Sequence, residues 1–325
     1  MATLKVEPIA VPARPDNRRW SRYSSRTFYL FVSPWLLGFL TLTVIPLIYA
    51  LGVSFTTFNG ISGRWHMIGW ANYSELLSDS QFWSSLEQTL IYVVIVVPVT
   101  VAGGMGLALL LNWRIRGIIV FRTIFYLPAV VPVVAAAITF KLVFDRNSGL
   151  VNALITQFGG TAIPWLLDPY AFTVLVLLVL WGVGGGMVIF LAGLQGIPQD
   201  LIDAASVDGA NALRRFLSIT LPLLSPIIFF QAVTGAIYAL QTLVQPLLLT
   251  AGQALGGGTG LSPQPSISST YLYMVNVYEE YFVTQRYGYG SALLWVLFLI
   301  ILAITLIVVR TGALWVYYDV DVDQR

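Results

Sequence analysis

The sequence predicts an all-α integral membrane protein with six transmembrane helices and both termini in the cytoplasm. Hydrophobic residues make up 57% of the 325 positions, and the mean hydropathy is +0.80. Only 10% of the residues are charged, against about 25% in an average soluble domain. Six apolar tracts also reach the length of about 20 residues that a bilayer-spanning helix needs.

The six predicted spans are apolar tracts too long for the strands or core helices of a soluble fold. They cover residues 28–55, 86–111, 121–144, 171–194, 226–250 and 291–310. Prolines inside these tracts predict kinked helices, because neighbouring helices in a bundle can satisfy the carbonyls that proline frees. Glycine clusters at 103–104 and 184–186 favour close approach of helix backbones.

Lysine and arginine are distributed unequally between the two predicted sides of the membrane. With an even number of spans, both termini share one side, and that side carries thirteen of the seventeen Lys and Arg residues. The other side has only Arg64, Lys141, Arg146 and Arg286. Because cytoplasmic loops are enriched in these residues, both termini are predicted to be cytoplasmic.

Three regions follow from this arrangement. Residues 1–27 form a polar, arginine-rich cytoplasmic tail, residues 28–310 the six-helix transmembrane domain, and residues 311–325 a second cytoplasmic tail. The first apolar tract is longer than the apolar region of a signal peptide, which has about 7–15 residues, so we expect an uncleaved first span. Lys141 lies four residues before Asp145 near the outer end of its tract, where snorkelling with a local ion pair is expected.

Composition excludes several function classes. The chain has no cysteine and one histidine, His66, so neither a thiolate site nor a histidine metal cluster is expected. A net charge of +2 does not indicate a nucleic-acid partner. Neither lysine ends a glycine-rich phosphate loop, so ATP hydrolysis would require another polypeptide. No pair of carboxylates lies within a predicted span, which argues against an enzyme and against proton or sodium coupling.

The segment between the fourth and fifth spans, residues 195–225, predicts two short helices joined by a turn. Pro198 suits the first position of a helix, and Asp200 suits its first turn, where the helix dipole favours negative charge. Asn211 can cap the second helix, and Pro222 is a plausible stop for it.

Small residues share faces of the first of these helices. Ala204 and Asp208 are four positions apart, as are Ala205 and Gly209. Gly209 also suits the left-handed conformation that ends a helix. The pattern indicates a slim knob with carboxylates at its edge, which fits a cleft on a partner that offers Lys or Arg. If the residue spacing is the only evidence, a solvated amphipathic loop is the alternative to this docking knob.

The loop carries a recognisable motif. Its order is Asp203-Ala204-Ala205-x-x-Asp208-Gly209-Ala210, followed by Phe216, Ile219, Leu221-Pro222 and Pro226. This pattern resembles the EAA loop of bacterial ABC importer permeases. It is most similar to the carbohydrate-uptake group that includes the maltose, lactose and glycerol-3-phosphate permeases. Similar elements at 121–128 and 287–292 extend the resemblance over nearly the whole chain after the N-terminal tail, and favour the larger, maltose-F-like permease of the usual pair.

The sequence departs from this family in two places. Asp203 stands where the family usually has Glu, which keeps the charge but shortens the side chain by one methylene. An element similar to the family's, Leu249-Thr250-x-Gly252, is followed by an extended Gly/Ser/Pro-rich stretch. The shape of the outer loop at 251–290 therefore does not follow from the resemblance.

The resemblance implies a type I importer permease fold in a bacterial or archaeal cytoplasmic membrane. It implies a second homologous permease, two cytosolic ATPase subunits that hold ATP and Mg²⁺, an extracytoplasmic solute-binding protein and a carbohydrate substrate. No cofactor is expected in this chain. The residues expected to couple it to the ATPase are Asp203, Ala204, Ala205, Asp208, Gly209, Ala210, Leu221 and Pro222.

A polar stripe is predicted in the fifth span. Gln231, Thr234, Tyr238, Gln241 and Gln245 are spaced three or four apart, which places them on one helical face. Amides facing lipid would be costly, so the stripe should face protein or a wet path. Two interpretations remain open: hydrogen bonding to a companion permease, and lining of the substrate path, with Gln241 and Gln245 the better candidates.

Trp181, beside the glycines of the fourth span, is a further candidate for the substrate path, although packing explains it equally well. The leading functional prediction is the permease subunit of an ATP-driven ABC importer for a carbohydrate, an oligosaccharide by preference. The same architecture importing glycerol-3-phosphate or a polyol is the alternative. A self-contained secondary transporter or channel is more distant, because no internal inverted repeat is visible.

Overall fold

The computed structural model describes residues 25–60, 65–113, 116–250, 268–312, 314 and 316, and every regular element among them is a helix; one isolated antiparallel bridge joins Thr56 and Met67. Most of the predicted N-terminal tail, the stretch at 251–267 and most of the C-terminal tail lie outside the described residues. By its internal contacts the chain divides into two units, Met1–Ala50 and Leu51–Arg325.

The first unit contains α1 (Ser25–Phe39), the π-helical turn η1 (Leu40–Val44) and the beginning of α2 (Ile45–Ser54). Pro46 is the second residue of α2. A proline ring clashes with the carbonyl four residues earlier and cannot donate a backbone hydrogen bond. The π turn widens the helix at this point, so the helix continues through the proline.

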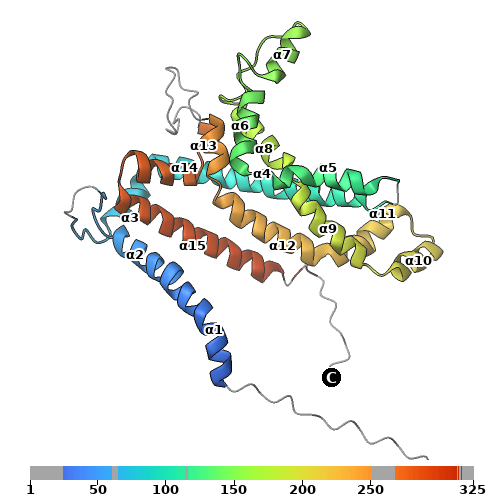
Figure 1. Ribbon diagram of the computed structural model, residues 1–325, viewed down its shortest axis with the longest axis horizontal. Coiled ribbons are helices and arrows are strands. Elements are labelled where there is room, and N and C mark those ends of the chain that lie inside the picture. The colour runs from blue at the N-terminus through green and yellow to red at the C-terminus, as the bar shows by residue number, and fades with distance from the viewer. Residues whose placement is uncertain are drawn as a thin grey trace, which may run out of the picture. The chain divides into compact units, whose positions relative to one another are not determined.

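The second unit contains the remaining helices of the described chain. They are α3 (Ala71–Ser78), α4 (Ser80–Leu111), α5 (Ile118–Val130), α6 (Val133–Val143), α7 (Leu150–Gln157), α8 (Ala171–Trp181), α9 (Gly184–Gly196), α10 (Gln199–Val207), α11 (Ala212–Arg215), η2 (Phe216–Thr220), α12 (Leu221–Leu240), α13 (Val244–Thr250), η3 (Ser268–Thr270), α14 (Tyr273–Tyr278), η4 (Glu279–Val283) and α15 (Tyr287–Gly312). In Figure 1, α3 and α14 lie at one end of this unit, and the hairpin of α10 and α11 lies at the other.

Four continuous helices are long and apolar enough to cross a membrane, and two bent pairs bring the number to the predicted six if each pair is one span. The continuous helices are Arg26–Ser54, Ser80–Leu111, Ala212–Leu240 and Tyr287–Gly312. The pairs α5–α6 and α8–α9 bend by 96° and 44°. The kink predicted from proline is confirmed at Pro132, between α5 and α6, whereas the helices that contain Pro46 and Pro98 are continuous and the bend between α8 and α9 has no proline. The fifth tract differs from its prediction, because its long helix begins fourteen residues earlier, at Ala212, and breaks after Leu240.

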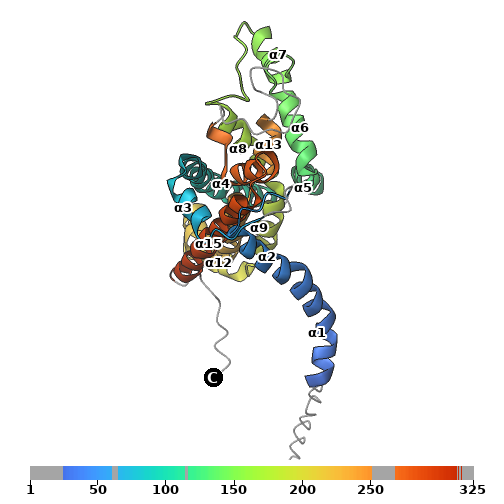
Figure 2. The same cartoon turned by 90° about the vertical axis from the view of Figure 1, so that its left-hand side faces the viewer.

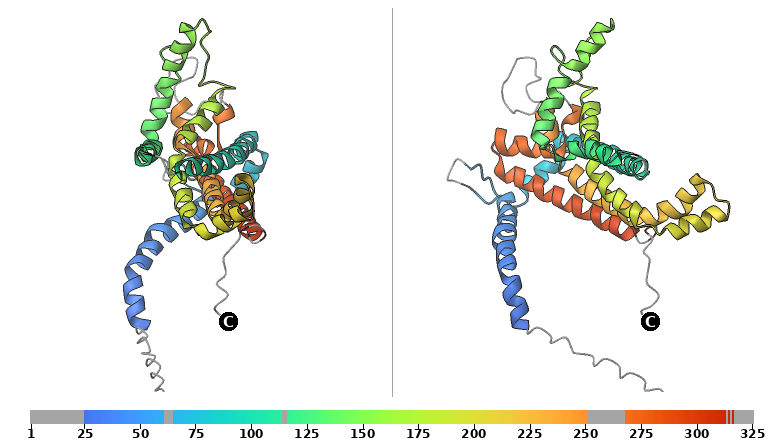
Figure 3. Two further views of the ribbon diagram at one scale, coloured as in Figure 1. Left: turned by 90° about the vertical axis from the view of Figure 1, so that its right-hand side faces the viewer. Right: turned by 45° about the vertical axis from the view of Figure 1, so that its right-hand side comes forward.

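Helix α4 is the centre of the packing. It lies against α9 and α12, and α12 also packs on α15 (Figure 3). Two buried apolar clusters lie along α4. One contains Tyr92 and Leu175, and the other contains Ala108 and Phe190. Most remaining helix surface exposes large apolar side chains, as expected where lipid is the solvent.

Glycines set the close contacts of α9. A Cβ on Gly184 would lie 1.9 Å from the carbonyl oxygen of Phe125 on α5. A Cβ on Gly104 of α4 would lie 3.3 Å from the backbone of Gly186. The predicted role of these glycine clusters in close helix approach is confirmed.

Helix α7 forms an arm that extends away from the rest of the second unit beyond α6, which itself packs against α13 and α8 (Figure 2). Buried Asn152 organises the chain at its tip. Its amide donates to the carbonyl oxygens of Arg146 and Ile163, at 3.1 and 2.8 Å, and its Oδ1 accepts from the backbone of Ile163 and the Trp165 indole. One side chain therefore holds the loop on both sides of α7.

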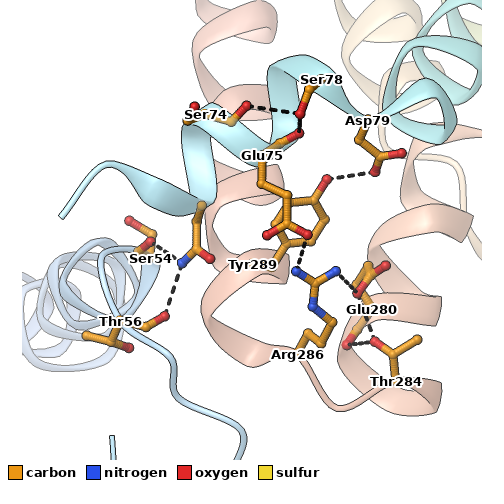
Figure 4. A network of polar contacts seen from close by, with 11 residues as sticks. Ser54, Thr56, Ser74, Glu75, Ser78, Asp79, Glu280, Thr284, Arg286 and Tyr289 are labelled. Carbon is orange, nitrogen blue, oxygen red and sulfur yellow. Dashed lines mark hydrogen bonds and ion pairs between the residues drawn. The ribbon is translucent and has the colours of Figure 1, made fainter. Parts of the chain in front are cut away.

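A polar network joins α3, η4 and the start of α15 (Figure 4). Arg286 pairs with Glu75 at 2.5 Å and with Glu280 at 3.7 Å, and its guanidinium lies 4.3 Å from the centre of the Tyr289 ring. The Tyr289 hydroxyl donates to Asp79 at 2.7 Å. We call these five residues the clasp. Burial raises the pKa of Glu280 above its usual value, so desolvation outweighs the nearby guanidinium there.

Candidate functional site

Helix α10 begins directly after Pro198, which is its N-cap residue with a ψ of 128°. The prediction that Pro198 occupies the first helical position is therefore wrong by one residue, because this ψ lies outside the helical range. Asp200 lies in the first turn, as predicted. Its charge is favourable at the positive end of the helix dipole.

Gly209 ends this helix with a φ of +78°. Its N–H donates to the Ser206 carbonyl at 3.1 Å, and the N–H of Ala210 donates to the Ala205 carbonyl at 2.9 Å. These two bonds form a Schellman motif, which needs a left-handed residue at this position. No atom lies within 4 Å of a Cβ built on Gly209. The backbone conformation alone therefore favours glycine, and the predicted helix end is confirmed.

Asn211 caps α11, as predicted, because its Oδ1 accepts from the backbone N–H of Arg214 at 2.8 Å. The prediction that Pro222 stops this helix is wrong. The helix continues from Ala212 to Leu240, and Pro222 lies in the first turn of α12. The π turn η2 comes directly before it and relieves the clash of the proline ring, as η1 does before Pro46.

Two side-chain contacts shape the hairpin of α10 and α11. The Asp203 carboxylate accepts from the Gln199 amide at 3.1 Å within α10. Arg215 donates to the hydroxyl of Ser206, which in turn donates to the Ile202 carbonyl at 2.7 Å. The second contact joins α11 to α10 and therefore fixes one helix against the other.

Exposure divides the predicted coupling residues into two sets. Asp203, Ala204, Asp208 and Gly209 are exposed, whereas Ala205, Ala210, Leu221 and Pro222 are half-buried. The last two belong to α12 rather than to the knob. Val207 at the tip is 88% exposed. The hairpin thus presents an apolar tip flanked by carboxylates, and a cleft with apolar and basic side chains would complement it.

A cavity of about 400 Å³ lies among α4, α6, α8, α12 and α13. It is lined by Tyr92, Val96, Thr100, Val133, Val179, Gly235, Tyr238, Ala239, Gln241, Thr242, Leu243, Val244 and Gln245. Most of its lining is apolar, and we call it the polar pocket for the amides and hydroxyls that several helices contribute to that lining. Its volume lies in the range of small-molecule sites, about 300–1,000 Å³.

The predicted polar stripe divides at this pocket. Tyr238, Gln241 and Gln245 line it, and Tyr238 is 78% exposed. Gln231 instead lies against Gly186 of α9, where an added Cβ would come 2.8 Å from its amide nitrogen. The hydroxyl of Thr234 donates to its own helix, to the Phe230 carbonyl at 2.7 Å. The break after Leu240 also interrupts the single helical face on which the stripe was predicted.

Trp181 does not line the polar pocket. Its ring packs on Phe140 of α6 at 5.7 Å between centroids. Sequence reasoning missed Tyr92, Thr100 and Thr242, which do line the pocket. The sequence does contain an indication of two of them, because Tyr92 and Thr100 are polar residues eight positions apart on one face of α4.

The part of the chain that the structure describes contains no group of three His, Cys, Asp or Glu side chains that could hold a metal ion. The pocket lining likewise has no Asp, Glu, Lys, Arg or His among its described residues. Binding there would depend on neutral hydrogen-bonding groups and an aromatic face, which suits hydroxyl-rich molecules.

Comparison with known proteins gives a consistent result. The family model for "Binding-protein-dependent transport system inner membrane component" matches residues 99–316. "Probable ABC transporter permease protein YesP" of Bacillus subtilis is 38% identical over 296 residues, which is 90% of this chain and 92% of that protein. The trehalose/maltose transport system permease protein MalF of Thermococcus litoralis is 32% identical, with 91% and 98% covered.

Solved structures show the same fold. A bacterial alginate ABC transporter, crystallised in complex with its alginate pentasaccharide-bound periplasmic protein, contains a chain that matches with a TM-score of 0.75. The match covers 89% of this chain and 94% of that chain at 20% sequence identity. This likeness supports an all-helical permease fold of the type predicted.

Proposed function

The chain belongs to the family of binding-protein-dependent transport system inner membrane components, and on this premise we propose that it is the permease subunit of an ATP-driven ABC importer for an oligosaccharide. It is a multi-pass membrane protein, and we place it in the cytoplasmic membrane with both termini inside. Relatives named for trehalose/maltose, arabinooligosaccharide and lactose transport support a carbohydrate cargo.

The observation that carries the proposal is the exposed hairpin of α10 and α11. It lies at the end of the bundle opposite α3 and α14 (Figure 1). In the proposed assembly it docks into a cleft of a cytosolic ATPase, with Asp203 paired to a basic side chain of that partner. ATP and Mg²⁺ bind the two ATPase subunits, and this chain acts as a permease rather than an enzyme.

The polar pocket supports the other half of the proposal. Tyr238 and Gln241 are exposed on one side of it although they lie in an apolar tract. Lipid against these groups would be costly, so we propose that a second homologous permease covers this side and completes the substrate path. An extracytoplasmic binding protein then delivers the sugar to the path from the α3 and α14 end.

Glycerol-3-phosphate or a polyol remains the alternative cargo for the same machine. The pocket lining offers neutral groups, which suits a polyol better than a phosphate. A self-contained secondary transporter is the more distant alternative. ATP dependence of uptake separates it from the proposal.

Gly209→Val tests the coupling role. A β-branched side chain is strained at a φ of +78°, so the Schellman motif and the hairpin should be distorted. In proteoliposomes with the companion subunits, we expect cargo-stimulated ATP hydrolysis to fall at least about tenfold, with unchanged membrane insertion. Gly209→Asn is the matched control, because asparagine tolerates the left-handed conformation. Full stimulation in the valine variant would contradict the coupling role.

Gln241→Leu combined with Gln245→Leu tests the substrate path. Leucine nearly preserves the volume of each side chain but removes four hydrogen-bonding groups from the pocket. We expect the initial uptake rate of the oligosaccharide to fall while the companion permease still co-purifies. Gln231→Leu, outside the pocket, should leave uptake near the wild-type rate. Normal transport by the double variant would show that neither amide belongs to the substrate path.

A further inference from the structure

An apolar groove of about 330 Å³ lies at the root of the hairpin, where α10 faces η2 and the beginning of α12. It is lined by Leu201, Ser218, Ile219, Pro222 and Leu223. We call it the root groove. Among these described residues only Ser218 has a polar side chain, so an apolar group that covers the groove removes apolar surface from water and is stabilised by it.

The root groove lies on the cytoplasmic side of the hydrocarbon layer. Helix α12 leads away from the hairpin and α15 runs back beside it (Figure 1). Arg310 in the last turn of α15 marks the edge of the hydrocarbon, and a Cβ on Gly312 would lie 2.7 Å from the Phe229 ring of α12. Pro222 precedes Phe229 by seven residues, or about 10 Å of helix toward the hairpin. A lipid chain is therefore not the expected occupant.

The chain that leaves α15 is directed toward this groove. Pro222 and Phe229 are two helical turns apart, so they share one face of α12. The groove therefore opens on the face of α12 along which α15 ends. Val316, the last described residue, is buried, and its N–H donates to the Gly312 carbonyl at 2.9 Å. The chain thus remains against the second unit up to residue 316.

The sequence after this point alternates between apolar and acidic side chains. The apolar or aromatic positions are Tyr318, Val320 and Val322, and the acidic positions are Asp319, Asp321 and Asp323. Successive side chains of an extended chain point to opposite sides, so one side of this segment is apolar and the other carries three carboxylates. Six extended residues span at most about 20 Å, which exceeds the 12 Å or so of helix between Pro222 and Arg214.

Arg214 offers a partner for the acidic side of the segment. Arg214, Ser218 and Pro222 are spaced four apart in the continuous helix Ala212–Leu240, which places Arg214 at the hairpin end of the root groove. Its side chain is exposed and makes no ion pair within the described residues. The carboxylates of α10 repel an acidic segment, so the acidic side faces α11.

We propose that residues 318–323 of this same chain bind in the root groove in extended form, with their apolar side in the groove and their acidic side toward Arg214. A segment tethered beside its site has an effective concentration of about a millimolar, which favours it over a separate partner. The docked segment joins the end of α15 to the root of the hairpin, so any displacement of the hairpin acts on α12 and α15 together. The proposal does not depend on the cargo or on ATP.

Disulfide crosslinking tests this docking, because the chain has no cysteine of its own. Ser218→Cys and Val320→Cys are combined in the full chain, which is assembled with its partner subunits in nanodiscs and oxidised with copper phenanthroline. Mass spectrometry identifies the linked peptides. We expect an intramolecular disulfide that forms at least about fivefold faster than in the matched control, Ser218→Cys with Asp321→Cys, because neighbouring side chains of an extended segment point to opposite sides.

Arg214→Gln provides the second arm. It removes the charge and keeps the backbone N–H that Asn211 caps. The rate of crosslinking between positions 218 and 320 should fall about threefold, the scale of one exposed ion pair, whereas Arg146→Gln in the turn before α7 should leave it unchanged.

Three results would overturn the proposal: no disulfide within one chain, equal rates for the Val320→Cys and Asp321→Cys pairs, or a rate unchanged by Arg214→Gln. If the Ser218→Cys chain does not insert, Leu223→Cys gives the same readout from the root groove. A disulfide between two copies of the chain, recognised by its doubled mass, would assign the groove to a second copy instead.

Discussion

At the scale of single residues, one carboxylate holds the turn that joins α6 to α7. Oδ1 of Asp145 accepts from the backbone N–H of Asn147 at 3.0 Å, the N–H of Ser148 at 2.8 Å and the Ser148 hydroxyl at 2.9 Å. The hydrogen bond from the Ser148 backbone is the main reason that the pKa of Asp145 lies below its usual value.

A pH dependence follows for this turn. Since the folded pKa is lowered, the ionised carboxylate stabilises the turn above the usual pKa of about 4, and this contribution is lost as the pH falls through the lowered value. We expect hydrogen exchange at Ser148, corrected for intrinsic rates, to show less protection at pH 3 than at pH 7. Asp145→Asn should lose much of this difference, and Ser148→Ala should keep it. Equal protection in the wild type at both pH values would contradict the assignment.

Residue patterns predicted those parts of the site that depend on local backbone chemistry. Gly209 and Asn211 have the roles expected from capping rules, because a helix end is decided within a few residues. Pro222 does not end its helix, because a π turn next to it absorbs the proline. The amino-acid composition of residues 216–220 does not predict that π turn.

At the scale of helices, hydropathy predicted where the chain is apolar but not where it bends. The break between α5 and α6, and the one after Leu240, lie inside tracts that read as continuous. Pro132 marks the first break, and Pro246, in the first turn of α13, lies just after the second. Its ring is incompatible with a helical carbonyl at Thr242, four residues earlier, so the helix breaks there and the predicted stripe of five residues is only partly assembled.

Gly184→Ala is the sharpest test of helix packing. Its new methyl group would lie 1.9 Å from the Phe125 carbonyl oxygen, so α5 and α9 must separate. We expect overpacking to cost about 1–3 kcal/mol and to lower the melting temperature of the purified protein. Gly196→Ala, at the other end of α9, meets no atom within 4 Å and should be neutral or slightly stabilising. Equal melting temperatures for the two variants would show that the contact with Phe125 is not tight.

At the scale of the whole second unit, the clasp joins segments more than two hundred residues apart in sequence. The Asp79 carboxylate caps α4 through the Gln81 N–H at 2.9 Å, and it also accepts from Tyr289 of α15. One side chain therefore sets the start of α4 against the start of α15. No sequence pattern predicted this network, because each of its residues is ordinary in its own segment.

Tyr289→Phe tests the clasp. The ring and its contact with Arg286 remain, but Asp79 loses a hydrogen bond from a buried hydroxyl. Such a bond to a charged group contributes about 1.5–3 kcal/mol, so we expect a lower melting temperature. The Tyr287 hydroxyl makes no hydrogen bond within the described residues. Tyr287→Phe should therefore have the same melting temperature as the wild type. If the Tyr289→Phe protein has the melting temperature of the wild type, the clasp does not contribute to stability.

The bend between α5 and α6 has a consequence for the surrounding bilayer. Thirteen residues give α5 a length of about 20 Å, and the turn of 96° sends α6 almost crosswise to it. Wherever α5 follows the bilayer normal, this flank covers only about two thirds of a 30 Å hydrocarbon layer. Such a hydrophobic mismatch is relieved by local thinning of the membrane or by oligomerisation, so short-chain lipids should gather along this flank wherever another subunit leaves it open.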